Sequence, residues 1–241
     1  MTMTNTQSGT TIDEIEAGIY RINTPVRDMP GGFSFNQYLV VDDEPLVFHT
    51  GPRRLFPFVR DAISYVLPVE KLRWIAFSHV EADECGGLND FLAVAPNAQP
   101  LCSQVAALVS VNDLADRSAR ARSDGETIAI GKRTLTWLDA PHLPHGWECG
   151  YLADVTNHTL FCGDLFTQPG ADTKPFTESD ILSPSEGFRK AMDYYSHTKR
   201  VRPLIENLAA TQPRTLACMH GSAWHGDGAA LLRALCDALD A

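Results

Sequence analysis

LRWIAFSHVEADECGG, residues 72–87, is an apolar run of strand length that leads directly into His79, Glu81 and Asp83. Side chains alternate along an extended or tightly turned segment, so ligands at every second position can converge on one side. Imidazoles and carboxylates bind metal ions in the forms that they adopt near neutral pH. The stretch therefore predicts a metal site at the end of a buried strand, with its ligands on the turn that follows.

Three more residues of ligand type stand just after apolar runs of strand length: His142, Asp164 and His220. Each has an ordinary interpretation by itself, because a lone His is usually only hydrogen-bonded and Asp164 could begin a helix. These separate interpretations do not explain why four strand ends are each followed by such a residue. Several carboxylates and imidazoles buried together without a counter-ion would be very costly. The combination favours a metal centre built from all four strand ends.

Short strands and helices alternate along the chain, and the strands are joined both by hairpins and by longer crossovers. Residues 36–41 and 45–49 predict one hairpin. This mixture is typical of an α/β fold with two sheets and helices outside, rather than of a doubly wound parallel sheet. We expect a disordered polar tail over residues 1–11, one domain over residues 12–241, and a long functional loop over residues 165–186.

The charge and composition exclude several kinds of partner. The chain has 241 residues, with 20 Lys and Arg against 30 Asp and Glu, and a formal net charge of −10. This acid excess argues against nucleic acid and anionic membranes, because phosphates require a basic footprint. No apolar run reaches the ~20 residues that span a bilayer, and the polar start MTMTNTQSGT lacks the features of a secretory signal. We therefore expect a cytoplasmic protein whose six cysteines are thiols.

The order of these motifs resembles the metallo-β-lactamase superfamily, and within it the flavodiiron proteins and the related oxygen-binding diiron proteins. Hydrolases of the superfamily usually read His-x-His-x-Asp-His, so Glu81 favours the diiron branch. The resemblance implies an αββα sandwich with the site at one edge of the two sheets. It rests on these segments: His79-x-Glu81-x-Asp83, His142-Leu143-Pro144, Cys162-Gly163-Asp164, His220-Gly221-Ser222 and Phe35-Asn36-Gln37-Tyr38-Leu39.

The resemblance also implies the ligands of each metal. One ion would be held by His79, Glu81 and His142, and a second by Asp83 and His220, with Asp164 bridging the two. Carboxylate-rich sites suit iron or manganese better than all-nitrogen zinc sites do, so we expect two ions, iron before zinc or manganese. The implied function is to bind or reduce O₂ or NO. A hydrolase of a small ester or thioester and a non-catalytic diiron oxygen sensor remain the alternatives.

Two positions depart from the pattern of these relatives. Glu84 stands where they usually have a His, and His49 stands where the superfamily usually has an Asp. We expect that Glu84 and His49 form a compensating pair beside the second metal, or that Glu84 binds that metal itself; a weak, degenerate second site is the alternative. His145 follows three residues after His142, and we expect it to support the ligands rather than to be one of them.

The remaining expectations concern cofactors and partners. The sequence shows no Gly-rich phosphate loop, so no flavin is predicted. Flavodiiron relatives usually carry a flavodoxin-like domain, which this sequence lacks, so a redox function would need an external electron donor. Relatives of this kind often pair head to tail, and the resemblance therefore implies a homodimer.

Overall fold

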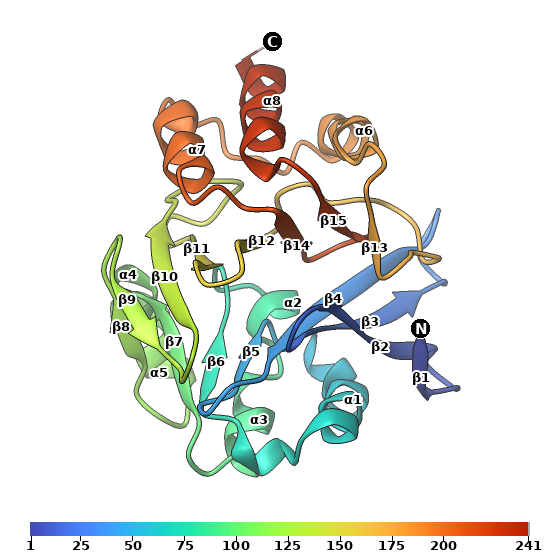
Figure 1. The fold of residues 1–241 in the computed structure, drawn as a ribbon, viewed down its shortest axis with the longest axis vertical. Coiled ribbons are helices and arrows are strands. Elements are labelled where there is room, and N and C mark those ends of the chain that lie inside the picture. The colour runs from blue at the N-terminus through green and yellow to red at the C-terminus, as the bar shows by residue number, and fades with distance from the viewer. Residues whose placement is uncertain (241) are drawn as a thin grey trace.

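Two mixed sheets face each other and carry helices on their outer faces (Figure 1). The computed structural model describes residues 1–240. The first sheet runs in chain order through β1 (Thr2–Asn5), β2 (Thr10–Glu16), β3 (Ile19–Val26), β4 (Phe33–Val40), β5 (Leu46–Phe48), β6 (Trp74–Ala76), β7 (Gln99–Ser103) and β8 (Arg120–Arg122). The second has the order β13 (Phe176–Thr177), β15 (Ala223–His225), β14 (Thr215–Cys218), β12 (Thr159–Gly163), β11 (Gly150–Asp154), β10 (Thr134–Asp139) and β9 (Thr127–Ala129).

The helices divide between the two outer faces. α1 (Phe56–Val66) and α3 (Leu88–Val94) pack on the first sheet, whereas α6 (Leu182–Met192), α7 (Val201–Ala209) and α8 (Gly228–Asp240) cover the second (Figure 1). The predicted sandwich of two sheets with helices outside is confirmed. The shorter helices are η1 (Arg53–Leu55), η2 (Val69–Lys71), α2 (Ala82–Cys85), α4 (Gln104–Ala106), η3 (Ala107–Val111) and α5 (Asn112–Leu114).

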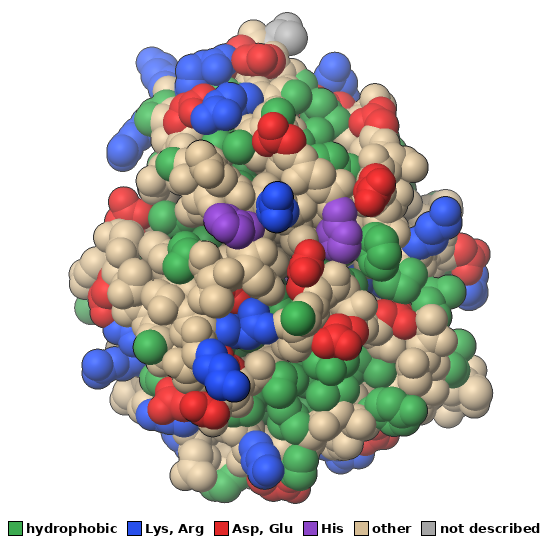
Figure 2. Space-filling view, in the orientation of Figure 1, with side chains coloured by type: hydrophobic (Ala, Val, Ile, Leu, Met, Phe, Trp, Pro, Cys, Tyr) green, Lys and Arg blue, Asp and Glu red, His purple; other side chains and the backbone are tan. Residues whose placement is uncertain are grey.

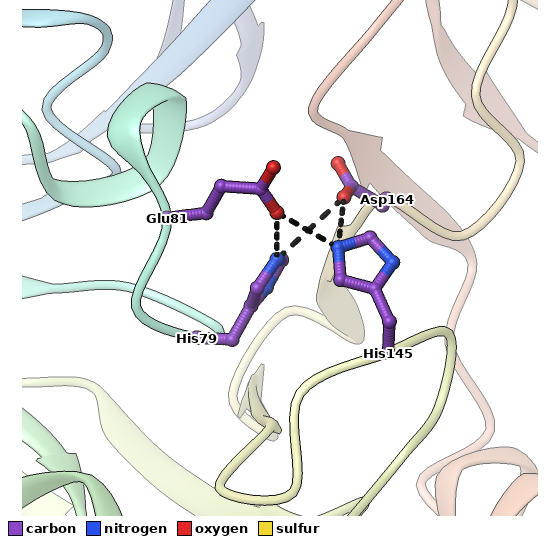
Figure 3. Close-up of side chains that lie close together, drawn as sticks. All are labelled: His79, Glu81, His145 and Asp164. Carbon is purple, nitrogen blue, oxygen red and sulfur yellow. Dashed lines mark hydrogen bonds and ion pairs between the residues drawn. The ribbon is translucent and has the colours of Figure 1, made fainter. Parts of the chain in front are cut away.

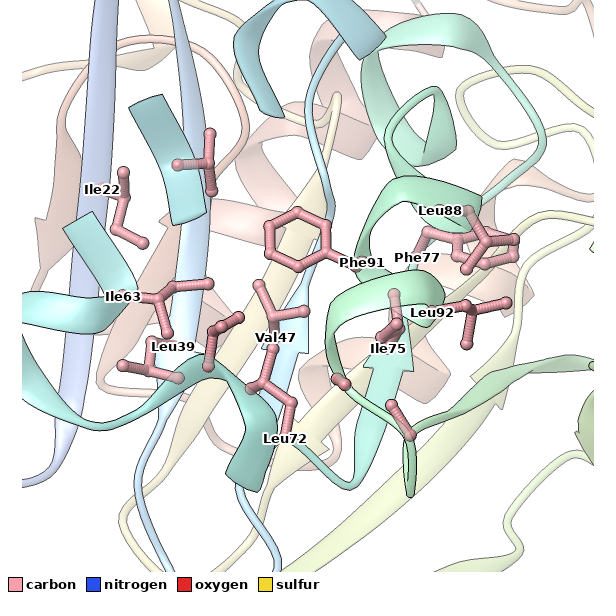
Figure 4. Packing of buried hydrophobic residues seen from close by; sticks show 14 of the residues in the cluster. Ile22, Leu39, Val47, Ile63, Leu72, Ile75, Phe77, Leu88, Phe91 and Leu92 are labelled. Atoms are coloured by element: carbon pink, nitrogen blue, oxygen red, sulfur yellow. The ribbon is translucent and has the colours of Figure 1, made fainter. Parts of the chain in front are cut away.

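Alternation along the strands builds a layered core. In β4, Tyr38 and Val40 point between the two sheets, while Leu39 joins the cluster under α1 and α3. Figure 4 shows that outer cluster, where Leu39 and Ile75 of the sheet lie near Ile63 of α1 and Phe91 of α3. Burying one face against helices and the other against the second sheet leaves the strand ends as the exposed places to build a site.

The predicted hairpin forms as β4 and β5, which pair antiparallel with Leu39 opposite Val47. The predicted tail is wrong, because β1 pairs antiparallel with β2 and Thr2 lies opposite Ile12. The hydroxyl of Thr10 also lies 2.9 Å from that of Thr24. The polar start is rich in β-branched threonine, which fits a pleated, half-buried surface even where its polarity suggests a tail.

The long loop is shorter than predicted, because α6 begins at Leu182 and includes Pro184 in its first turn. Proline is tolerated there, since the first turn of a helix has no partner for the missing N–H. Within residues 1–240, no helix is both long and apolar enough to cross a membrane. Figure 2 shows acidic and basic side chains interspersed over one face, so the net charge of −10 is not gathered into one patch there.

Candidate metal centre

The candidate ligands lie on turns at one edge of the sandwich. The turn after β6 leads into α2, and β12 and β14 of the second sheet end nearby; a further loop joins β10 to β11. Rigid strands fix where these turns begin, and the turns leave the side chains accessible. The residues brought together are His79, Glu81, Asp83, Glu84, His145, Asp164 and His220.

Gly163 allows two of these turns to meet. Its φ of +49° lies in the left-handed region, and a Cβ there would lie 2.8 Å from Oγ of Ser78. Glycine adopts this conformation without steric cost. The end of β12, which carries Asp164, can therefore approach the residue before His79.

A first group of four side chains converges from three segments of the chain (Figure 3). Nε2 of His145 lies 2.9 Å from Oε2 of Glu81, and Nε2 of His79 lies 3.2 Å from the same oxygen. Oδ2 of Asp164 lies 3.5 Å from Nε2 of His145 and 3.8 Å from Nε2 of His79. His79 and Asp164 are buried, while the side chain of Glu81 is 52% exposed and leaves one side of the group open to solvent.

A second group consists of Asp83, Glu84 and His220. Nε2 of His220 lies 3.5 Å from Oδ2 of Asp83 and 3.2 Å from Oδ1 of Asp164. The two oxygens of Asp164 thus face different groups, with Oδ2 toward the first and Oδ1 toward the second. This is the arrangement that a carboxylate shared between two ions requires.

Hydrogen bonds at Nδ1 aim the imidazoles at the site. Nδ1 of His220 donates to the carbonyl of Ser34 at 2.8 Å, and Nδ1 of His145 donates to the carbonyl of Tyr194 at 3.2 Å. A carbonyl only accepts, so Nδ1 is the donor in both rings. The other ring nitrogen, Nε2, faces the carboxylates. Metal-binding histidines are usually oriented in this way by a partner on the other ring nitrogen.

His49 reaches the site through Ser78 instead of through Glu84. Its Nε2 lies 3.1 Å from Oγ of Ser78, which in turn lies 2.9 Å from Nδ1 of His79, and its Nδ1 lies 2.8 Å from the sulfur of Met219. Burial lowers the pKa of His49 to about 3, so the ring is neutral and can accept a hydrogen bond. The predicted pair of His49 with Glu84 is wrong.

In the metal-free chain, protons on neighbouring groups offset the negative charge of the clustered carboxylates. Hydrogen bonds from His145 and His79 lower the pKa of Glu81 to about 2. Burial would lower the pKa of His220, but hydrogen bonds to Asp164 and Asp83 raise it to about 10. Burial, with Asp164 and Asp83 nearby, raises the pKa of Glu84 well above its ordinary range. The chain therefore concentrates negative charge where it needs cations, whether protons or metal ions.

The residues present fit a pair of metal ions. Both carboxylate oxygens of Glu84 are buried and have no hydrogen-bond partner. Such groups are rare in folded proteins and point to a ligand. Three imidazoles and four carboxylates form a donor set of nitrogen and hard oxygen, the set that suits iron and manganese.

His142 lies outside both groups, which corrects its assignment as a ligand. Its side chain is exposed, and its φ of +65° places it in the left-handed region. Its backbone N–H donates to the carbonyl of Gly146 at 2.8 Å, which closes the loop with Leu143 turned inward and buried. His145 takes the place predicted for His142, so it faces the other ligands directly and is more than a supporting residue. The burial of Leu143 between the two histidines is a tertiary contact, so no signal in the sequence distinguished them.

Aromatic residues lie along one side of the site, and two of them, Phe33 and Phe188, were not singled out from the sequence. The ring of Phe33 lies 4.3 Å from that of His220, and Phe188 stacks on Phe33 at 5.7 Å. Tyr194, on the chain after α6, donates its hydroxyl to the carbonyl of Asp164 at 3.2 Å. The rings of Phe33 and Phe188 form an apolar wall beside His220 of the second group, and the ring of Tyr194 lies 6.0 Å from that of His145 in the first group.

The chain is similar to known proteins over most of its length. A family model described as ODP family beta lactamase matches residues 33–221. The nitric oxide reductase of Moorella thermoacetica is 25% identical over an aligned length of 239 residues, and the alignment covers 92% of this chain and 57% of that protein. The chain spans about half the length of the curated relatives that it matches.

Solved structures share the fold. Rubredoxin oxygen:oxidoreductase from Desulfovibrio gigas superimposes with a TM-score of 0.81 at 20% identity, over 95% of this chain and 61% of that chain. The flavodiiron protein from Giardia intestinalis gives a TM-score of 0.80 at 22% identity, over 95% and 59% of the two chains. The chain corresponds to the metallo-β-lactamase-like part of such proteins.

Proposed function

The chain belongs to the ODP family of beta-lactamase-like proteins, and we propose that it is a dinuclear metal protein that binds or reduces O₂ or NO. We propose iron as the metal, held in one position by His79, Glu81 and His145 and in the other by Asp83 and His220, with Asp164 shared. The observation that carries the proposal is the position of Asp164, whose two oxygens face two separate His/carboxylate groups.

The names of relatives support the choice of O₂ or NO as the ligand. A relative from Moorella thermoacetica is a nitric oxide reductase, and one from Megalodesulfovibrio gigas is a rubredoxin-oxygen oxidoreductase. Glu81 supports the same choice, because a carboxylate in place of an imidazole makes the first position harder and more anionic. Reduction of the bound gas would require electrons from an external donor.

Two iron ions would supply reducing electrons and open coordination positions for a diatomic ligand. The residues of the chain would supply geometry and environment. The carbonyls of Ser34 and Tyr194 hold two imidazoles with Nε2 toward the ions. Phe33 and Phe188 place an apolar surface beside His220, which would favour a small, weakly polar ligand over a hydrated one.

Anaerobic loading with Fe(II) followed by exposure to O₂ or to NO tests the proposal. We expect about two irons per chain and a change of the absorption spectrum on exposure to either gas. Hydrolysis of small esters and thioesters by the same sample is the comparison assay. Fast hydrolysis without a spectral response to either gas would support the metallohydrolase instead.

A further inference from the structure

Glu84 is a buried carboxylate without a hydrogen-bond partner, in the middle of the site. Its exposed fraction is 0%, and neither of its side-chain oxygens has a partner among the described residues. It lies on α2, directly after Asp83, with its backbone carbonyl accepting from the N–H of Thr50 at 2.7 Å. A carboxylate buried in this way is costly unless a cation binds it.

The position of Glu84 connects the two groups. One of its oxygens belongs with Asp83 and His220, whose ligand atoms all lie within 4.8 Å of one another. Its Oε2 also lies 3.9 Å from Nε2 of His79 in the first group. Glu84 thus lies beside the boundary between the two groups, as Asp164 does.

We propose that Glu84 is a metal ligand, which completes the second position and makes the centre a four-carboxylate site. This inference rests on the proposed dinuclear centre and deepens it. Glu81, Asp83, Glu84 and Asp164 together carry four negative charges when ionised, which balance the four positive charges of two divalent ions. An imidazole at position 84 would leave one positive charge uncompensated. Charge balance explains how the chain accommodates the buried carboxylates of Glu84 and Asp164 beside Glu81 and Asp83.

The added carboxylate predicts which metals the second position selects. Oxygen ligands favour iron and manganese, and imidazole favours zinc relative to them. The wild-type chain should therefore discriminate against zinc at this position more strongly than a variant with an imidazole at residue 84.

Three variants test the role of Glu84. Glu84→Gln keeps the shape but removes the charge, and Glu84→His supplies an imidazole. Glu148→Gln is the matched control, because Glu148 is also buried beside the site, where it accepts from the N–H of Val80 at 3.0 Å, but belongs to neither ligand group. Metal content and competition titrations with Fe(II), Mn(II) and Zn(II) are measured on each, together with the unfolding temperature with and without metal.

We expect Glu84→Gln to weaken the second ion at least about 10-fold, the lower end of the loss seen even for residues that only support ligands. Its metal-free form should be as stable as the wild type or more so, because a buried unpaired carboxylate is gone. Glu84→His should shift the preference toward zinc, and Glu148→Gln should change neither affinity nor preference.

Two results would overturn the inference about Glu84. The first is two ions bound by Glu84→Gln with wild-type affinity. The second is an equal loss of stability with and without metal, which would make Glu84 a structural residue. In both cases the wild type would still bind two ions, so the proposed function would stand; a wild type that binds none would refute the proposed function itself.

Discussion

Metal affinity at the second position should rise steeply with pH. Nε2 of His220 must lose its proton before it can bind a metal ion, and the pKa of His220 in the metal-free chain is about 10. About pH 7 is roughly three units below that pKa. Removing the proton from His220 at this pH therefore costs about 4 kcal/mol, at ~1.36 kcal/mol per unit. The apparent affinity should therefore increase about tenfold per pH unit between about pH 6 and 8 from His220 alone.

Glu84 increases this slope. Burial, with Asp164 and Asp83 nearby, raises its pKa well above the ordinary range, which favours its protonated form in the metal-free chain, and a metal ion bound there competes with that proton. The slope should then exceed tenfold per pH unit in the wild type and fall in Glu84→Gln. Both effects have the same sign, because raising the pH removes the protons that compete with the metal ion.

Equilibrium competition between the protein and a chelator, in anaerobic buffers from about pH 6 to 8, measures the slope. Calorimetry in buffers of different ionisation enthalpy counts the protons released. An affinity that does not change over this range would mean that His220 is already neutral in the metal-free chain or does not bind the metal, contrary to this expectation. The variant His220→Asn serves as the control, since its remaining second-position affinity should lack the His220 contribution.

Four substitutions give further expectations, each checked by metal analysis after iron loading. Asp164→Asn should lose both ions together, and retention of full metal content would show that Asp164 is not shared. His145→Ala should lose the first ion while His142→Ala keeps both, and the reverse order would restore the assignment made from the sequence. Ser78→Ala should lower first-position affinity about 10–100-fold, because the ring of His79 loses its orienting partner; unchanged affinity would make that contact incidental.

The fold and most of the site could be predicted from the sequence because the signals are local. The apolar run before His79 predicts β6, and the ligand spacing after it predicts the turn that presents His79, Glu81 and Asp83. Asp164 and His220 follow their strands just as directly. These residues converge in the structure because parallel and antiparallel strand ends meet at one edge of the sandwich.

No local sequence signal shows whether His142 or His145 is the ligand. The two residues are three apart in one loop, and the left-handed backbone at His142, with φ of +65°, decides which of them faces the site. Non-glycine residues adopt this conformation rarely, so the sequence gives little sign of it. Which histidine is the ligand depends on how Leu143 packs into the core, a tertiary contact that spacing does not reveal.

The predicted pairing of His49 with Glu84 was wrong for a similar reason. The segments do meet, since the N–H of Thr50 donates to the carbonyl of Glu84. His49 follows β5 with a φ of +66°, in the left-handed region, and its ring lies on the side of Ser78 and Met219. Sequence comparison could identify the exchange of residue types but not the direction of each side chain.

In the proposed centre, two metal ions share Asp164. Anomalous scattering at the iron absorption edge, measured on crystals of the iron-loaded protein, would locate both ions. We expect two peaks, one among His79, Glu81 and His145 and one among Asp83, Glu84 and His220, with Asp164 touching both. A single fully occupied peak, or two peaks that Asp164 does not contact, would contradict it.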